Sequence, residues 1–250
     1  MQNSLLNHRS IRDFSNEGIP QTAVDTMIDA ACRASTTGNM QLYSIVLTTK
    51  DSLKQKLWEA HFKQQMVKQA PLVATFCADF NRFNKWCDLN CAKPGYDNFL
   101  SFFTAAIDAL LAAQNFCIAA EELGYGICYL GTTTYMAKKI SDILDLPNHV
   151  VPITTVVTGK PNTSPTLTDR LPNEAIVHHE TYIDYTDERI KQLYAQKEGL
   201  EMYQKIVKDN GVENLAQVFT QKRYTKNDNV TFSNMLLELL RQKGFMNHDQ

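Results

Sequence analysis

Hydrophobic side chains recur along this chain in two patterns, one helical and one strand-like. Val24, Met27, Ile28 and Ala31 fall three or four residues apart, which predicts an amphipathic helix over 23–34. Short β-branched and apolar runs predict strands over 43–49, 72–78, 127–131 and 150–157. Further helices are expected over 51–61, 135–144, 186–209 and 232–243, with a polar, basic surface loop over 221–229. Strands that alternate with helices favour an α/β layered domain.

The longest apolar segment, residues 99–123, is hydrophobic nearly all the way round a helix. This predicts a helix buried in a core or in a subunit interface. Asp108 and other polar residues interrupt the segment, and the 12 residues 109–120 are its longest uncharged run. A bilayer requires about 20 apolar residues, so we predict no membrane span. The chain begins without a basic region followed by an apolar one, and the expected compartment is the cytoplasm.

Composition and charge are typical of a globular protein rather than a disordered or fibrous one. The 250 residues are 44% hydrophobic and 21% charged, and the formal net charge is −2. This near-neutral balance argues against a broad nucleic-acid surface. Since no linker divides the chain, we predict one domain over 1–250, in which 186–250 form a C-terminal helical extension.

Six cysteines are too few and too scattered for a disulfide scaffold. Cys87 and Cys91 lie one helical turn apart and resemble half of a metal site. A tetrahedral zinc site needs four ligands, and no second Cys or His pair at ligand spacing follows. The pattern therefore favours structural or surface thiols over a metal site.

Common catalytic motifs, such as a nucleophile elbow or a Walker loop, are missing from the sequence. Instead, H-R-S-I-R at 8–12 gathers cationic groups and a hydroxyl, which on a turn leading to a helix would suit a phosphate and a polar ring edge. The alternative is a solvated basic N-terminus. The loop 35–41 begins with Ser35 and offers hydroxyls and backbone N–H groups around Gly38, but an ordinary helix-to-strand connection has the same composition.

Taken together and in order, these segments resemble the nitroreductase-type flavoenzyme family, in its branch of NADPH-linked oxygen-insensitive nitroreductases and flavin reductases. The resemblance covers residues 5–185 and is weaker in the C-terminal helices. Its motifs are H-R-S-I-R at 8–12, S-T-T-G-N-M-Q at 35–41, Q-A at 69–70 with F-C-A-D-F-N-R at 76–82, A-A-Q-N-F-C-I-A-A-E-E-L-G-Y-G at 112–126, Y-L-G at 129–131, L-P-N-H-V-V-P at 146–152, T-G-K-P at 158–161 and D-R-L-P at 169–172.

This resemblance implies an α+β fold, an intertwined homodimer and one FMN at each subunit interface. It also implies roles for individual residues. His8, Arg9 and Arg170 would help to hold the FMN phosphate, and Ser10 would contact the ring or ribityl chain. Thr36, Thr37 and Asn39 would come from the partner subunit, Gln69 would hydrogen-bond the pyrimidine side of the ring, and Tyr129, Leu130 and Gly131 would flank it. Arg12 would place a cation near the N1–C2=O edge of the flavin. A cation at that edge stabilises the reduced ring. The full predicted FMN set is His8, Arg9, Ser10, Arg12, Ser35, Thr36, Thr37, Asn39, Gln69, Tyr129, Leu130, Gly131 and Arg170, with no catalytic side chain and no metal ligand.

Two positions depart from the pattern of this branch. Thr168 stands two residues before Arg170, where the branch usually has a Lys, so one charge partner of the phosphate is missing unless Lys160 or another base replaces it. Thr132 replaces the second glycine of the usual I-G-G and brings a side chain beside the flavin. Both changes affect the expected affinity and substrate fit rather than the fold.

The implied activity is an FMN-dependent NAD(P)H oxidoreductase, NADPH-preferring, which reduces nitroaromatics, quinones or flavins by ping-pong hydride transfer through flavin N5. Lys222, Arg223 and Lys226 are candidates for binding the 2′-phosphate of NADPH, with Arg223 the leading one, although a solvated charged loop explains them equally well. The alternatives are a free-flavin or metal-chelate reductase on the same fold, and a flavin-binding protein with little turnover.

Overall fold

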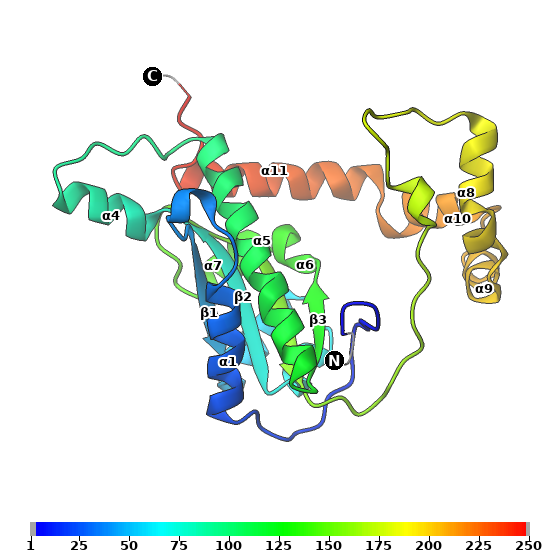
Figure 1. The fold of residues 1–250 in the computed structure, drawn as a ribbon, viewed down its shortest axis with the longest axis horizontal. Helices are drawn as coiled ribbons and strands as arrows, with labels where there is room; N and C mark the ends of the chain where they lie inside the picture. Colours follow the sequence, from blue (N-terminus) through cyan, green and yellow to red (C-terminus); the bar gives the residue numbers. More distant parts are fainter. Residues whose placement is uncertain (1–3, 249–250) are drawn as a thin grey trace. The chain divides into compact units, whose positions relative to one another are not determined.

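A four-stranded antiparallel sheet forms the centre of the larger of two units in the computed structural model, which describes residues 4–248 (Figure 1). The strand order is β1-β2-β4-β3, and every neighbouring pair is antiparallel. The strands are β1 (Tyr43–Thr48), β2 (Leu72–Asp79), β3 (Gly126–Leu130) and β4 (Val150–Gly159). The fold is therefore α+β, as the resemblance implied, rather than the α/β arrangement that the interleaved pattern favoured.

Helices cover both faces of this sheet because alternate side chains of β2 point in opposite directions. Leu72, Ala74 and Phe76 are buried in one cluster with α1 (Gln21–Cys32) and α5 (Phe99–Glu122). Val73 belongs to a second cluster on the other face, which is built with α2 (Asp51–Ala60), α3 (Met66–Gln69) and α7 (Ala137–Ile143). All eight residues of β2 are buried, so this strand is the middle of the core.

A third cluster closes one end of the sheet. Phe80, which precedes α4 (Asn81–Leu89), packs there with Ala105 of α5 and with Leu239 and Phe245 near the C-terminus. Leu239 belongs to α11 (Lys226–Gln242), whose sequence pattern predicted only 232–243. The residues of this larger unit are 1–166 and 232–250.

The helix α5 is the longest in the described residues, and its two sides differ. Asn98 Oδ1 accepts a hydrogen bond from Ser101 N at 3.1 Å and caps its start. Gly124, with φ of +82°, lies just past its end and adopts the left-handed conformation that favours glycine. The inner side is buried, whereas large apolar side chains on the outer side stay 43–52% exposed, namely Phe103, Ile107, Leu110 and Leu111.

By length and composition alone, α5 is also the one helix within residues 4–248 that could cross a membrane. More than half of its apolar window, 56%, is buried against the rest of the protein. A mostly buried core helix satisfies the same criterion, so the hydropathy of α5 is explained by its packing on the sheet.

Residues 167–231 form the second unit, which is helical. Its helices are α8 (Asp187–Gly199), α9 (Glu201–Asp209), α10 (Leu215–Gln217) and a π-helical turn (Val218–Arg223). The predicted surface loop over 221–229 is wrong, because the π-helical turn reaches Arg223 and α11 begins at Lys226. That residues 1–250 act as one domain with an extension over 186–250 stays a prediction.

The N-terminal segment runs extended beside the start of β3 and does not form the turn leading to a helix on which its cationic groups would suit a phosphate. Ser10 forms a parallel bridge with Ile127, and Ile11 N donates to Ile127 O at 2.9 Å. The next helix, α1, begins only at Gln21. The two backbones approach closely because Gly126 has no side chain: a Cβ there would lie 2.5 Å from Ile11 Cγ1.

Replacing Gly126 with alanine should therefore lower the free energy of unfolding by about 1–3 kcal/mol, the usual cost of overpacking. Urea unfolding followed by circular dichroism measures this change. Gly95→Ala is the matched control because a Cβ at that position would have no atom within 4 Å, and it should change stability by less than about 0.5 kcal/mol. Equal stability of the two variants would show that the contact between the N-terminal segment and β3 is loose.

Candidate functional site

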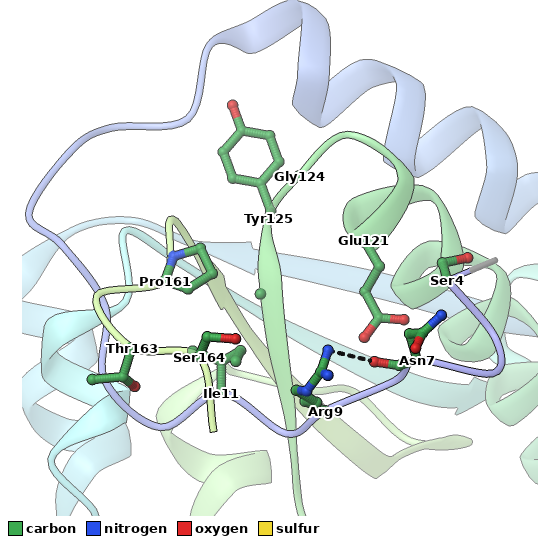
Figure 2. A pocket seen from close by; sticks show the side chains of 11 residues that line it. Ser4, Asn7, Arg9, Ile11, Glu121, Gly124, Tyr125, Pro161, Thr163 and Ser164 are labelled. Atoms are coloured by element: carbon green, nitrogen blue, oxygen red, sulfur yellow. Dashed lines mark hydrogen bonds between the residues drawn. The ribbon is translucent and has the colours of Figure 1, made fainter. Parts of the chain in front are cut away.

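A cavity of about 390 Å³ lies where the N-terminal segment crosses the end of α5 and the start of β3 (Figure 2). Arg9 and Glu121 lie at one end of this cavity, and Pro161 and Ser164 at the other. Its lining residues are Ser4, Asn7, Arg9, Ile11, Glu121, Gly124, Tyr125, Gly126, Pro161, Thr163 and Ser164. Of the two predicted phosphate ligands in the N-terminal motif, Arg9 lines this cavity, whereas His8 is partly buried beside it and is not a lining residue.

Arg9 has a hydrogen-bond donor that the chain itself does not use. Its Nη1 donates to Asn7 O at 3.2 Å, whereas its Nε is buried and has no partner among residues 4–248. A buried guanidinium donor without a partner is costly unless a ligand or water satisfies it. An anionic group in the cavity would supply the missing acceptor.

His8 is held by an acidic neighbour that the sequence did not indicate. Its Nδ1 lies 2.6 Å from Glu121 Oε1, near the end of α5. Because a carboxylate only accepts, this contact places a proton on Nδ1 and fixes the ring orientation. Glu121 therefore acts on the N-terminal motif through His8.

Ser10 and Arg12 lie along the neighbouring strand β3. Burial raises the pKa of the Cys128 thiol, while the charge of Arg12 and a hydrogen bond from Ser10 oppose this rise. Arg12 itself is exposed. Ser10 and Arg12 thus lie near the first half of β3.

The residues predicted to flank the flavin, Tyr129, Leu130 and Gly131, lie at the carboxyl end of β3. Leu130 is buried, Tyr129 is partly buried, and Gly131 is exposed at the start of α6 (Thr132–Tyr135). Burial raises the pKa of Tyr129 well above its ordinary value, and its hydroxyl lies 3.4 Å from Gln114 Oε1. The Tyr129 hydroxyl therefore stays protonated at neutral pH.

Thr132, the residue that replaces glycine, is engaged within the chain. Its Oγ1 lies 2.8 Å from His61 Nδ1 and 3.4 Å from Gln64 Nε2. His61 is fully buried, and burial lowers its pKa to about 4, so the ring is neutral. The hydroxyl of Thr132 therefore contacts the residues after α2.

The predicted loop 35–41 precedes β1 at the end of the sheet opposite to the first cavity. Thr37 N and Thr37 Oγ1 donate to Asp108 Oδ1 of α5 at 3.0 and 3.2 Å. Asn39 lies on the rim of a second cavity, of about 550 Å³, which is also lined by Trp86 of α4. Ser35 is exposed, and Thr36 Oγ1 accepts from Gln41 N at 3.4 Å.

Gln69 lies in a third cavity, of about 460 Å³, next to a buried lysine. Lys54 is 6% exposed, and its Nζ donates to Lys68 O at 3.3 Å and to Ala70 O at 3.2 Å. These carbonyls flank Gln69 on both sides, so Lys54 fixes the backbone from which the Gln69 side chain projects.

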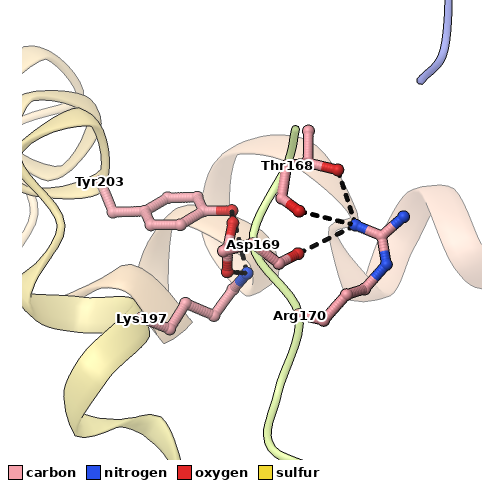
Figure 3. Close-up of polar contacts among 5 residues, drawn as sticks. All are labelled: Thr168, Asp169, Arg170, Lys197 and Tyr203. Atoms are coloured by element: carbon pink, nitrogen blue, oxygen red, sulfur yellow. Dashed lines mark hydrogen bonds and ion pairs between the residues drawn. The ribbon is translucent and has the colours of Figure 1, made fainter. Parts of the chain in front are cut away.

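Arg170 belongs to the second unit and lies beside a charged cluster (Figure 3). Its Nη1 donates to Thr168 Oγ1 at 2.6 Å and to Asp169 O at 2.9 Å. Asp169 accepts from Lys197 Nζ and from Tyr203 Oη, each at 2.7 Å, and these two donors lower the pKa of the Asp169 carboxyl. Thr168, which stands in place of the expected lysine, thus orients the guanidinium that remains.

Within one chain, three of the predicted site residues line three separate cavities. Arg9 lines the first, Asn39 the second and Gln69 the third. Arg223 is exposed at the end of the π-helical turn of the second unit. Within residues 4–248, no group of three His, Cys, Asp or Glu side chains is arranged to hold a metal, and all six cysteines are free.

Comparison with known proteins assigns this arrangement to a family. The family model described as the nitroreductase family matches residues 5–160. The chain belongs to the nitroreductase family.

Several members of the nitroreductase family resemble this chain over most of its length. The FMN reductase (NADPH) of Bacillus subtilis is 30% identical over 242 residues, which are 96% of this chain and 91% of that protein. The oxygen-insensitive NADPH nitroreductase of Salmonella typhimurium is 33% identical over 77% of this chain and 78% of its own. A provisionally named oxidoreductase from Bacteroides fragilis has a crystal structure with a TM-score of 0.97, 51% identity and coverage of 98% of this chain and 100% of that one.

Sequence reasoning missed four residues that hydrogen-bond to the segments carrying the predicted site residues: Lys54, His61, Asp108 and Glu121. Two of them gave a usable signal, because Asp108 and Glu121 are acidic residues in an otherwise apolar helix. A charge in such a helix is costly unless it is paired, and its presence indicates a specific partner. Lys54 and His61 stand in ordinary polar surroundings and gave no signal.

His61 should make the stability of the protein depend on pH. Its native pKa is about 4, against 6.5 as the ordinary value, so between these pH values the unfolded chain binds a proton that the native state does not. The free energy of unfolding should therefore fall by about 3 kcal/mol as pH drops from 6.5 to 4. Thermal unfolding across this range, compared between the wild type and His61→Asn, measures the contribution.

The His61→Asn variant should lose most of this pH dependence, since asparagine keeps a polar atom near Nδ1 but does not titrate. His179→Asn is the control because His179 is exposed, and its pH profile should match that of the wild type. An unchanged profile in His61→Asn would mean that the native ring is not buried and neutral.

Proposed function

We propose that this protein is an FMN-dependent NADPH oxidoreductase that reduces nitroaromatics, quinones or flavins. Membership of the nitroreductase family supports this, as do relatives named FMN reductase (NADPH) and oxygen-insensitive NADPH nitroreductase that match most of the chain. The observation that carries the proposal for this chain is the cavity beside H-R-S-I-R, because Arg9 lines it and the buried Arg9 Nε has no hydrogen-bond partner in the described part of the chain.

The donors around this cavity fit the chemistry of a flavin nucleotide. Arg9 offers an unused N–H group and a permanent positive charge, which suit a phosphate. The segment 8–12 bridges the start of β3 through Ser10 and Ile127, and the exposed Gly131 just past the other end of this strand leaves room for a flat ring. FMN, when bound, accepts a hydride from NADPH and passes electrons to the second substrate.

The side chains of the protein have supporting roles in this proposal. Arg12 supplies positive charge at the ring edge where negative charge develops on reduction. Gln69 offers an amide for the pyrimidine side, and Lys54 holds its backbone in place. Arg170 adds a second guanidinium for the phosphate, with one amino group oriented by Thr168. Arg223, a permanent cation in the second unit, is the proposed contact for the 2′-phosphate of NADPH.

The first experiment is the visible spectrum of the purified protein before and after anaerobic addition of NADPH. We expect an FMN spectrum that bleaches with NADPH and returns on addition of a nitroaromatic or a quinone. A flavin that stays oxidised with both NADPH and NADH would contradict the proposed activity and favour a flavin-binding protein. Failure to take up added FMN would contradict the whole proposal.

Arg12→Ala should lower the rate of flavin reduction by NADPH by about tenfold to a hundredfold, because it removes the cation from the ring edge. Stopped-flow absorbance on protein saturated with FMN measures this rate. Arg33→Ala removes another exposed cation, just after α1, and should leave the rate unchanged. An unaltered rate in Arg12→Ala would remove this residue from the site.

A homodimer in the cytoplasm is part of the proposal. The outer side of α5 supports a dimer, since four large apolar side chains on one helix are each more than two-fifths exposed. The exposed loop 35–41 adjoins the same helix through Asp108, so a dimer built on α5 would bring this loop to the neighbouring subunit.

Leu110→Glu should convert the dimer to a monomer and reduce FMN retention, because it places a charge in the centre of this apolar surface. Sedimentation velocity with and without FMN measures both effects. Leu89→Glu is the control, since Leu89 is 85% exposed on α4 rather than on α5, and the variant should remain dimeric. A dimeric Leu110→Glu variant would exclude α5 as the interface.

A further inference from the structure

The loop 35–41 has an unusual backbone. Gly38, Asn39 and Gln41 all adopt left-handed conformations, with φ values of +55°, +57° and +50°. Such conformations are unfavourable for residues other than glycine and persist where surrounding contacts impose them. The contacts that impose this shape should therefore be visible in the structure.

One buried carboxylate on α5 joins the two ends of the loop. Asp108 is 1% exposed, and its Oδ1 accepts from Thr37 N and Thr37 Oγ1. Its other oxygen, Oδ2, accepts from Leu42 N at 3.2 Å, where the loop enters β1. The same side chain thus holds the residue before the left-handed stretch and the residue after it.

Three donors satisfy a charge that would otherwise be costly in this position. A carboxylate buried in an apolar helix is tolerated only where hydrogen bonds replace water. The neighbouring positions of α5, Ile107 and Leu110, face outward and belong to the proposed dimer surface. Asp108 therefore links that surface to the loop through a rigid helix.

We infer that Asp108 is a positioning residue for the flavin site, which holds Thr36, Thr37 and Asn39 in the conformation that contacts FMN. This inference rests on the proposed function, because it assumes that the loop binds the cofactor. Asp108 touches no reacting group in this scheme and acts only through the loop. Its loss should therefore weaken FMN binding more than it changes the chemical step.

The test compares Asp108→Asn with the wild type. Asparagine keeps the shape and one acceptor oxygen, but its amide nitrogen cannot accept from the second loop donor. We expect the Kd for FMN, from quenching of flavin fluorescence, to rise about tenfold or more. With FMN saturating, kcat should stay within about twofold of the wild-type value, whereas a general loss of fold would lower kcat at every FMN concentration.

Ser101→Ala is the matched control. Ser101 is also buried on α5, and its hydroxyl hydrogen bond goes to Asn98 at the start of the helix rather than to the loop. This variant should keep the wild-type Kd for FMN. If Asp108→Asn is folded and binds FMN as tightly as the wild type, the inference is overturned.

If Asp108→Asn does not fold, hydrogen–deuterium exchange on the unaltered apoprotein tests the inference instead. The Thr37 and Leu42 amides should exchange with deuterium at least about tenfold more slowly than in an unstructured chain, because the carboxylate holds them. Exchange at the unstructured rate would overturn the inference. Wild-type protein that binds no FMN would instead overturn the proposed function and, with it, this role of Asp108.

Discussion

The close packing of α5 on the sheet is the constraint on which the rest of the structure depends. The inner side of this helix is made largely of alanine, and Ala109, Ala112, Ala113 and Ala120 are fully buried. Small side chains allow the helix to approach the strands, and Phe116 fills the remaining space with an edge-on contact to Phe76, 5.6 Å between ring centres. The large apolar residues that have no room inside are left on the outer side, where the proposed partner subunit would cover them.

Buried charges then fix the segments that surround the candidate site. Asp108 holds the loop before β1, Lys54 holds the backbone around Gln69, and Glu121 holds His8. Asp108 and Lys54 are both less than one-tenth exposed, and each is satisfied chiefly by backbone groups. A charge that depends on specific backbone donors or acceptors favours one conformation of the segment that supplies them. The side chains proposed to contact the ligand can then be exposed while their backbone is rigid.

The sequence predicted the core elements well and their connections less well. Strands over 43–49 and 72–78 and the helix over 99–123 differ from β1, β2 and α5 by one residue at most at either end, because their hydrophobic patterns are long and uniform. The extended path of 8–12 was not predictable from local composition, since it depends on Gly126, more than a hundred residues away. The polar stretch 221–229 looked like a loop, but helical backbone there is compatible with exposed polar side chains. Asp108 could have been singled out as a charge in an apolar helix; its partners, distant in sequence, could not.

The two threonines that depart from the family pattern have a common physical feature. Each hydroxyl is engaged by side chains of the same chain: Thr132 with His61 and Gln64, and Thr168 with Arg170. A hydroxyl that is already hydrogen-bonded contributes little polarity to a neighbouring ring, so Thr132 adds mainly a methyl group at the end of β3. Thr168 lacks the positive charge that a lysine would have at this position, but its hydroxyl orients the guanidinium of Arg170. In the proposed phosphate role of Arg170, the paired N–H groups of the guanidinium would keep the directional part of phosphate recognition, and only the less directional attraction of a lysine would be lost.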